Sequence, residues 1–165
     1  MITIQKITSS EANGFASLTA KLASQTKFMM REPSEANLTE AAAKLMIVNV
    51  EKEDNFLYVA KKGKQVVGFM SATKGTFIRT KHLAYIVVGI LAEYSGQGIG
   101  QRFMDELNQW ATGQKLRRLE LTVMTHNYNA IRLYEKNGFV KEGVKKDAMF
   151  IDGQFVDEFY MARIL

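Results

Sequence analysis

The feature of this chain that most constrains its fold is an apolar run that leads through alternating glycines into an amphipathic helix. Residues 83–91 form the run, and the glycines follow at Gly96, Gly98 and Gly100. Glycine leaves the amides of a loop uncovered, and the first amides of a helix have no intrahelical partners. Because the positive end of the helix dipole lies at the same place, this unit predicts a phosphate or pyrophosphate site.

Two familiar nucleotide-binding patterns do not fit this loop. A Walker loop requires Gly-Lys-Ser/Thr, and no lysine follows Gly100. A Rossmann fingerprint requires Gly-x-Gly-x-x-Gly, normally in the first βα unit, whereas the spacing here is Gly96-x-Gly98-x-Gly100 in mid-chain. The alternative that stays open is a tight strand–helix turn without a ligand.

Two motifs in this order resemble the GNAT family of N-acetyltransferases. The segment Ser95-Gly-Gln-Gly-Ile-Gly100 is similar to the family's cofactor loop, Arg/Gln-x-x-Gly-x-Gly/Ala. The segment Asn127-Tyr-Asn-Ala-Ile-Arg-Leu-Tyr-Glu-Lys-Asn-Gly-Phe139 resembles the family signature Asn-x-x-Ala-x-x-Leu-Tyr-x-x-x-Gly-Phe. Residues 151–161 resemble the closing hairpin of many bacterial members. The likeness covers residues 55–165 well and the preceding part by element order.

Composition and length are typical of a small enzyme. With 165 residues, 47% of them hydrophobic and 24% charged, the chain is expected to fold as one domain over 1–165. No apolar run approaches the length of a membrane span, and the N-terminus lacks the apolar segment of a signal peptide. The chain has no cysteine and only two histidines, which excludes disulfides and the usual metal sites. We therefore expect a cytoplasmic protein without a metal and without a membrane.

The formal net charge of +5 does not by itself indicate a nucleic-acid partner. Lys61-Lys-Gly-Lys64 is the densest basic cluster, and it lies between two strand-like runs, where a solvated hairpin turn is expected. No basic stripe follows one helix face, and no aromatic RNA-binding strand motif is present. We expect no nucleic acid as a partner, and a basic nucleic-acid-associated module is the weaker alternative.

Periodicity predicts a mixed α/β domain in the order βααβββαβαββ, a central sheet flanked by helices. The expected strands cover residues 2–7, 55–61, 65–73, 83–91, 117–123, 140–146 and 155–164, and the later helices cover 98–112 and 130–137. Ser10 is expected to cap the first helix, and Asn37-Leu-Thr-Glu40 resembles a capping box for the second. In that second helix the residues expected to face inward are Leu45, Met46 and Val50. Asp152-Gly153 is a hairpin signal, and Gly138 is expected to end the last helix.

The family resemblance implies acetyl-CoA as cosubstrate and a splay between the fourth and fifth strands. The backbone of Val88–Ile90 would pair with the pantetheine arm, the amides of Gly96–Gln101 would hold the pyrophosphate, and Ile99 would pack inward. Ser95 stands where the family usually has Arg or Gln, which removes one side-chain donor. The cofactor-binding residues that the resemblance implies are Val88, Gly89, Ile90, Ser95, Gly96, Gln97, Gly98, Ile99, Gly100, Gln101 and Asn127.

Gly89 also stands out from the residues themselves, because it interrupts a continuous apolar strand. A bulge or a close backbone approach would require it there, and an ordinary strand glycine is the equal alternative. By resemblance, Tyr134 would be the general acid that protonates the leaving thiolate. A core aromatic beside Leu133 and Phe139 is the plain alternative for this tyrosine.

The general base is not assigned by the sequence. Some relatives place a glutamate five residues before Asn127, where this chain has Thr122. The open candidates are Glu120, Glu32 and Glu35, or water. The expected function is acetyl transfer from acetyl-CoA to a primary amine of a small molecule, peptide or protein. The oligomeric state stays open between a monomer and a homodimer, and relatives in the family are frequently dimers. An acyl-CoA-binding sensor without turnover is the alternative from another class.

Overall fold

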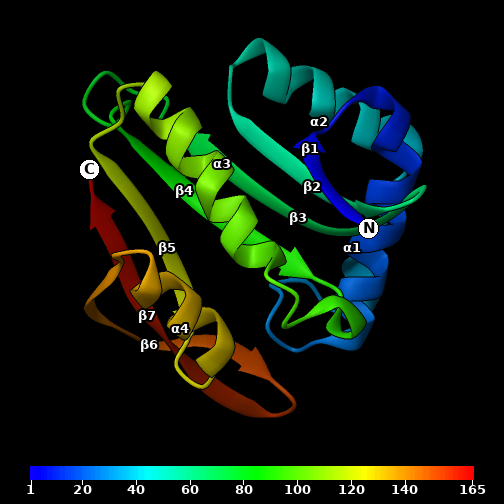
Figure 1. The fold of residues 1–165 in the computed structure, drawn as a ribbon. Helices are drawn as coiled ribbons and strands as arrows, with labels where there is room; N and C mark the ends of the chain where they lie inside the picture. Colours follow the sequence, from blue (N-terminus) through cyan, green and yellow to red (C-terminus); the bar gives the residue numbers. More distant parts are fainter. The chain divides into compact units, whose positions relative to one another are not determined.

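The computed structural model describes residues 1–165, and its elements follow the predicted order (Figure 1). The strands are β1 (Ile2–Lys6), β2 (Phe56–Lys62), β3 (Gln65–Lys74), β4 (Leu83–Ile90), β5 (Arg118–Met124), β6 (Val140–Ile151) and β7 (Gln154–Ile164). The helices are α1 (Ala12–Gln25), α2 (Glu40–Lys52), α3 (Ile99–Gly113) and α4 (Tyr128–Lys136), with short 3₁₀ turns η1 (Ser9–Glu11), η2 (Pro33–Glu35) and η3 (Ala92–Tyr94). The α/β class and the order βααβββαβαββ are confirmed.

The strands are hydrogen-bonded in the order β1-β2-β3-β4-β5-β7-β6. The sheet is mixed, because β4 and β5 run parallel whereas β1–β2, β2–β3, β5–β7 and β6–β7 are antiparallel. The chain divides into two compact units. The first contains residues 1–73 and 87–110, and the second contains residues 74–86 and 111–165. Strand β4 contributes its first half to the second unit and its last half to the first. One domain over 1–165 stays a prediction.

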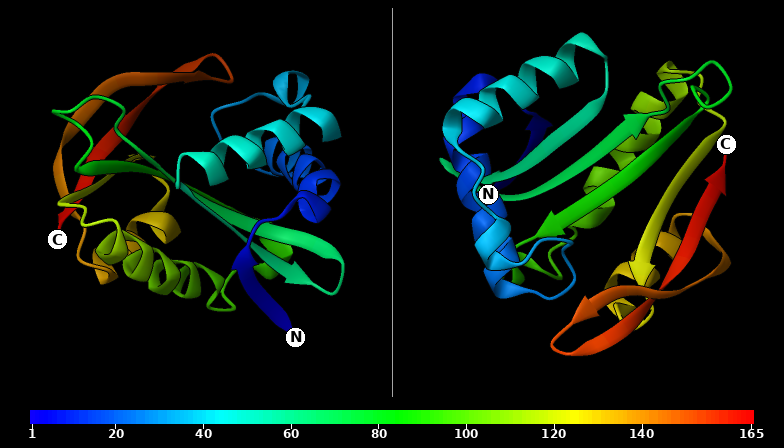
Figure 2. Two further views of the ribbon diagram at one scale, coloured as in Figure 1. Left: turned by 90° about the horizontal axis from the view of Figure 1, so that it is seen from above. Right: turned by 180° about the vertical axis from the view of Figure 1, so that it is seen from behind.

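In the first unit, helices cover both faces of the strands. Helices α1 and α2 lie on one face and α3 lies on the other (Figure 2). On the α1 side, the rings of Phe15 and Phe69 meet edge to face at 5.4 Å between centroids. On the α3 side, Trp110 contacts Phe56 at 5.6 Å. Because both faces are covered, β2 and β3 are nearly continuous runs of buried residues.

Two details of the helices differ from the sequence predictions. Ser10 does not cap α1; instead Thr8 and Glu11 form a capping box around η1, and α1 follows directly. Helix α2 is capped by Thr39, whose hydroxyl accepts the Ala42 amide at 3.1 Å. Its buried face carries small and β-branched residues, so the inward position expected for Leu45 was wrong. The buried residues of α2 are Ala43 and Ile47, whereas Leu45 is 63% exposed and Met46 and Val50 are half-buried.

The lysine cluster at the β2–β3 turn is also not fully solvated. Gly63 has a φ of +59° in that turn, as a tight hairpin requires. However, the Lys61 ammonium reaches the buried Glu11 carboxylate at 3.0 Å, and Lys62 lies over the Tyr94 ring at 5.6 Å. The lysine cluster, which the sequence predicts to be a solvated turn, therefore supplies Lys61 to an ion pair with the buried Glu11.

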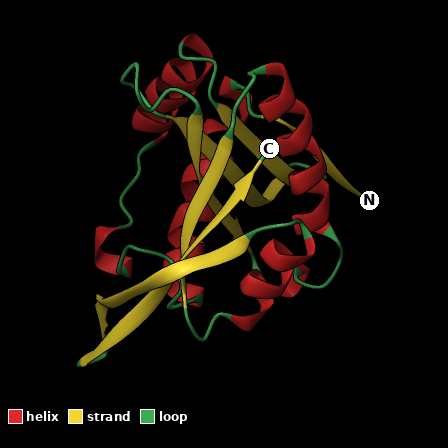
Figure 3. Ribbon diagram, turned by 90° about the vertical axis from the view of Figure 1, so that its left-hand side faces the viewer, coloured by secondary structure: helices red, strands yellow, loops and turns green.

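In the second unit, β5 lies between β4 and β7, and β6 forms the edge. Figure 3 shows β6 and β7 as a long ribbon. Asp152 and Gly153 both have positive φ, 52° and 77°, which is the backbone of the predicted two-residue turn. Strand β6 continues to Ile151, beyond the predicted end, with register shifts after Lys141 and Lys145. Gly138, with φ of +86°, follows the end of α4 as expected.

Candidate active site

The loop between β4 and α3 has the backbone that an anion site requires. Gly96 and Gly98 have φ of +74° and +76°, a region that glycine enters without a steric penalty. A Cβ added at either position would meet no atom within 4 Å, so open space lies in front of both residues. The turn before them is fixed by backbone bonds, from the Tyr94 amide to the Leu91 carbonyl at 2.9 Å and from the Ser95 amide to the Ala92 carbonyl at 3.1 Å. The backbone at Gly96 and Gly98 is therefore open, and the preceding turn holds it in place.

Helix α3 begins at Ile99, directly after this loop. Ile99 is 2% exposed, which agrees with the predicted inward packing and anchors the helix start. The side chains of the two glutamines in this segment bond within the chain: Gln97 donates to the Glu93 carbonyl at 3.3 Å and Gln101 to Asp105 at 3.1 Å. Arg102 donates to the Ile2 carbonyl at 2.8 Å. The groups presented at the open face are thus the loop amides and the helix dipole.

Gly89, in the last half of β4, is required by close packing of side chains. A Cβ there would lie 2.7 Å from Leu22 Cδ1 and 2.9 Å from Phe69 Cε1. On the neighbouring strand, a Cβ at Gly68 would lie 3.2 Å from the Gly89 carbonyl oxygen and 3.3 Å from the Ile90 side chain. Of the alternatives left by the sequence, these contacts favour a close approach over an ordinary strand glycine, and the approach to Gly89 is by side chains and not by backbone. The close approach comes from α1 and β3.

In the second unit, Asn127 precedes helix α4 and Tyr134 lies within it. Asn127 is the N-cap, and its side-chain oxygen accepts the Ala130 amide at 3.4 Å. Tyr134 is 5% exposed, and its ring packs against Phe139 at 5.8 Å between centroids. Burial, together with the neighbouring Tyr85, raises the pKa of the Tyr134 phenol well above its ordinary value. The phenol therefore keeps its proton throughout the physiological pH range.

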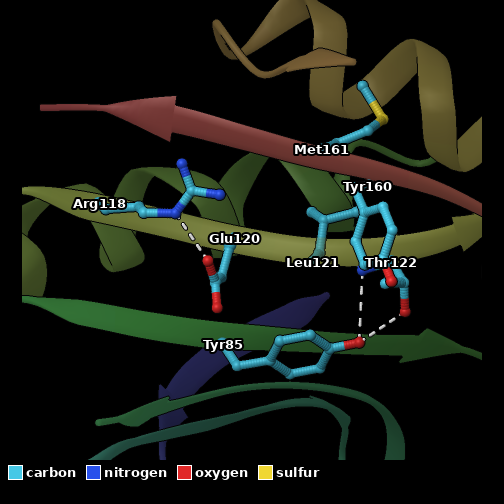
Figure 4. A pocket seen from close by; sticks show the side chains of 7 residues that line it. All are labelled: Tyr85, Arg118, Glu120, Leu121, Thr122, Tyr160 and Met161. Atoms are coloured by element: carbon cyan, nitrogen blue, oxygen red, sulfur yellow. Dashed lines mark hydrogen bonds and ion pairs between the residues drawn. The ribbon is translucent and has the colours of Figure 1, made fainter. Parts of the chain in front are cut away.

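A cavity of about 310 Å³ lies in the same unit, between β4, β5 and β7 (Figure 4). Its lining residues are Tyr85, Arg118, Glu120, Leu121, Thr122, Tyr160 and Met161. The β4–β5 ladder covers three residue pairs and ends at Tyr85 and Glu120. Just beyond, the Tyr85 hydroxyl bonds Thr122 Oγ1 at 2.7 Å and accepts the Thr122 amide at 3.3 Å. The Tyr85 hydroxyl thus satisfies the Thr122 amide beyond the end of the β4–β5 ladder.

The charged wall of this cavity is centred on Arg118. Its Nε donates to Glu120 at 2.6 Å, and its two terminal nitrogens donate to the two oxygens of Glu142 at 3.0 and 2.5 Å. Hydrogen bonds from Arg118 hold the pKa of Glu142 below its usual value, and both glutamates hold the pKa of Arg118 above its own. Of the residues proposed as base, Glu120 therefore lines the cavity as the partner of an arginine.

The other candidate bases are not part of the cavity wall. Glu32 and Glu35 lie in the first unit around η2, are exposed, and are bonded to each other through the Glu32 amide at 3.1 Å. Sequence reasoning had missed Tyr85, Arg118 and Tyr160. Alternation along β5 places Arg118, Glu120 and Thr122 on one face and could have indicated the arginine. The two tyrosines lie on other strands, and they can be placed beside β5 only when the strand register is known. This register pairs Tyr85 with Glu120 and Tyr160 with Thr122.

Comparison with known proteins identifies the family. The sequence profile of the acetyltransferase (GNAT) family matches residues 22–139, which is more than half of the chain. The chain belongs to the GNAT family. Both motifs that carried the resemblance, the glycine loop and the Asn127 segment, lie inside the matched range.

Three curated relatives are N-acetyltransferases with different acceptors in their names. The L-amino acid N-acetyltransferase of Escherichia coli is 31% identical over 60% of this chain and 62% of its own length. The ribosomal protein uS5-alanine N-acetyltransferase of the same organism is 29% identical over 57% of this chain and 48% of its own length. The spermidine N(1)-acetyltransferase of Vibrio cholerae is 26% identical over 79% of this chain and 74% of its own length. The chain thus spans about half to two thirds of the first two relatives.

Solved structures agree on the fold. A GNAT acetyltransferase from Streptococcus pneumoniae superimposes with a TM-score of 0.95 at 24% identity, over 100% of this chain and 99% of its own. A phosphinothricin acetyltransferase of the GNAT superfamily from Sinorhizobium meliloti, solved in complex with acetyl-CoA, gives a TM-score of 0.87 at 19% identity over 99% and 88% of the two chains. At these identities the agreement concerns the fold. No helix of this chain has the length and apolarity needed to cross a membrane.

Proposed function

We propose that this protein transfers an acetyl group from acetyl-CoA to a primary amine of a small molecule or peptide. The observation that carries the proposal is the loop at Gly96 and Gly98. It combines positive φ, open space in front of two missing side chains, and the start of α3. Bare amides at a helix start fit a pyrophosphate. Family membership supports the same ligand, and acetyl-CoA supplies the activated acetyl thioester.

The roles proposed for the cofactor-binding residues follow from this fit. The amides of Gly96–Gln101 hold the pyrophosphate, and Ile99 anchors them from below. The backbone of Val88–Ile90 binds the pantetheine arm as an added strand would. Ser95 contributes no long side-chain donor, so affinity depends on the amides and the helix dipole. Asn127 fixes the start of α4 and contacts the cofactor arm.

We assign the general acid to Tyr134. Its buried phenol holds a proton at Oη, and this proton is donated to the thiolate as it leaves. Burial keeps the Tyr134 phenol protonated until the thiolate forms, and the phenolate left by the transfer has to regain a proton from solvent. The ring contact with Phe139 keeps the side chain in one position.

No side chain is assigned as the general base. Glu120 is bonded to Arg118, and Glu32 and Glu35 are exposed residues of the other unit. Thr122, at the position where some relatives have a glutamate, bonds Tyr85 and has no basic group. We propose that the ammonium of the acceptor loses its proton to water.

The experiment that tests this function is a two-part assay on the purified protein. Coenzyme A should raise the melting temperature in a concentration-dependent manner, because a ligand of the native state stabilises it by RT ln(1 + [L]/Kd). Free thiol should then be released from acetyl-CoA when a panel of primary amines is added. Coenzyme A binding without thiol release for any amine would favour the acyl-CoA sensor. Absence of binding at millimolar coenzyme A would overturn both.

A further inference from the structure

We propose that the cavity lined by Tyr85, Glu120, Thr122 and Tyr160 binds the acceptor and selects an aliphatic diamine or polyamine over an amino acid. The inference rests on the proposed acetyl transfer and specifies its acceptor. It is carried by the charges and hydrogen bonds of the cavity wall, all within the second unit.

The first step concerns the net charge of the cluster that Arg118 forms with Glu120 and Glu142, of which Arg118 and Glu120 line the cavity. Arg118 contributes one positive charge, and Glu120 and Glu142 contribute two negative charges through bonds of 2.5 to 3.0 Å. The cluster therefore carries one excess negative charge at neutral pH. Glu120 lines the cavity itself, and its side chain is 30% exposed. A second ammonium group on the acceptor would meet a carboxylate there, whereas a carboxylate on the acceptor would be repelled.

The second step concerns the arginine, which would otherwise be the natural site for a substrate carboxylate. A guanidinium binds carboxylates through a planar fork of N–H groups. Both terminal nitrogens of Arg118 are bonded to Glu142, and the Nε is bonded to Glu120. Because Glu142 occupies the fork of the two terminal nitrogens and Glu120 occupies Nε, the carboxylate of an amino acid could bind Arg118 in bidentate fashion only by displacing one of these glutamates. The structure thus assigns Arg118 to orienting Glu120 and Glu142.

The third step concerns the uncharged part of the wall. The side chains of Tyr85 and Tyr160 are partly exposed, and their rings offer apolar surface to methylene groups and π faces to an ammonium. The hydroxyls of Tyr85 and Thr122 are bonded to each other in this wall (Figure 4). The Glu120 carboxylate beside the rings of Tyr85 and Tyr160 suits an acceptor with a flexible methylene chain and an ammonium at the end opposite the reacting amine.

Three probes of equal chain length test the selectivity: putrescine, butylamine and γ-aminobutyrate. They carry an ammonium, a methyl group or a carboxylate at the end opposite the reacting amine. We expect kcat/KM to decrease in that order, with putrescine at least about tenfold above butylamine, the usual value of one charge-assisted hydrogen bond. Equal rates for putrescine and γ-aminobutyrate, or faster acetylation of γ-aminobutyrate, would overturn the inference.

Two substitutions connect the selectivity to the cluster. Glu120→Gln removes the facing charge and should lower the preference of putrescine over γ-aminobutyrate by at least about tenfold. Glu142→Gln leaves the terminal nitrogens of Arg118 with a neutral partner and should raise the affinity for γ-aminobutyrate. The matched control is Glu135→Gln, an exposed glutamate of the same unit that pairs with Lys141, and it should keep the wild-type preference. If both cluster variants keep the wild-type preference, the charge argument is wrong.

Calorimetric binding of the same probes to the protein without acetyl-CoA separates this inference from the proposed function. Selective putrescine binding that is lost in Glu120→Gln, without turnover, would support the cavity assignment and overturn the acetyl transfer. Turnover of all the amines without preference would support the acetyl transfer and overturn the cavity assignment. Neither binding nor turnover of any of the amines would overturn both.

Discussion

The ion pair between Glu11 and Lys61 makes the stability of the first unit depend on acid pH in a way that can be calculated. The Glu11 side chain is 5% exposed. Burial alone would raise its pKa, but hydrogen bonds from the Thr8 hydroxyl, the Lys61 ammonium, the Thr8 amide and the Ser10 hydroxyl lower it from 4.5 to about 2. The folded state therefore stabilises the ionised form of Glu11 more than the unfolded chain does.

The sign and size follow from proton linkage. Because the folded pKa lies below the unfolded value, the contribution is fully present above pH 4.5 and is lost as the pH falls toward 2. The shift from 4.5 to about 2 corresponds to roughly 3–4 kcal/mol as an upper bound, at about 1.4 kcal/mol per pKa unit. Since the Lys61 side chain keeps 20% exposure and water screens the pair, we expect about 1–3 kcal/mol.

The test is Glu11→Gln, measured by urea unfolding with the fluorescence of Trp110, which lies in the same unit. At pH 7 the variant should be less stable by about 1–3 kcal/mol, and at pH 2.5 most of this difference should disappear, because the wild-type carboxyl is then largely neutral in the unfolded chain and partly so in the native one. Glu40→Gln is the control, an exposed i,i+4 partner of Lys44 that should change stability by less than about 0.5 kcal/mol. An equal loss at both pH values would refute the reasoning, because the effect would then be steric.

Two further predictions concern packing and catalysis. Gly89→Ala should lower the free energy of unfolding by about 1–3 kcal/mol in thermal or urea melts, because the new methyl group would lie 2.7 Å from Leu22 Cδ1 and 2.9 Å from Phe69 Cε1; unchanged stability would mean that α1 shifts freely. Tyr134→Phe should lower kcat and kcat/KM alike by about 10²–10⁴ while coenzyme A affinity, measured by calorimetry, stays near the wild-type value. Wild-type turnover in this variant would make Tyr134 a core aromatic.

The order of elements was predictable because it depends on local periodicity and turn residues. Asp152-Gly153 and Gly138 need positive φ, and the structure has it at all three. Leu45 shows where such reasoning fails. The apolar residues of α2 fit more than one face, and the buried face instead carries Ala43 and Ile47. Which face is buried depends on the elements that pack against the helix, and the sequence of the helix does not contain that information.

The glycine loop was predictable, whereas the cavity was not. The loop is one continuous segment, and the glycines that allow its positive φ angles lie close together in the sequence. The cavity wall joins β4, β5 and β7, and the second partner of Arg118 is 24 positions away on β6. Glu142 reaches the arginine at a register shift between Lys141 and Gly143, an irregularity that alternation along β6 would not place. Glu11 and Lys61, 50 positions apart, are paired by the same kind of tertiary contact.

The measurement that tests the central claim most directly is calorimetric binding of coenzyme A to the wild-type protein, Gly98→Asp and Gly63→Asp. Both glycines have positive φ, and a Cβ at either meets no atom within 4 Å, so the two variants carry similar backbone strain. Only Gly98→Asp adds a negative charge at the proposed pyrophosphate site before α3. The account predicts that Gly98→Asp loses binding while Gly63→Asp binds like the wild type. Normal coenzyme A binding by Gly98→Asp, or equal loss in both variants, would contradict it.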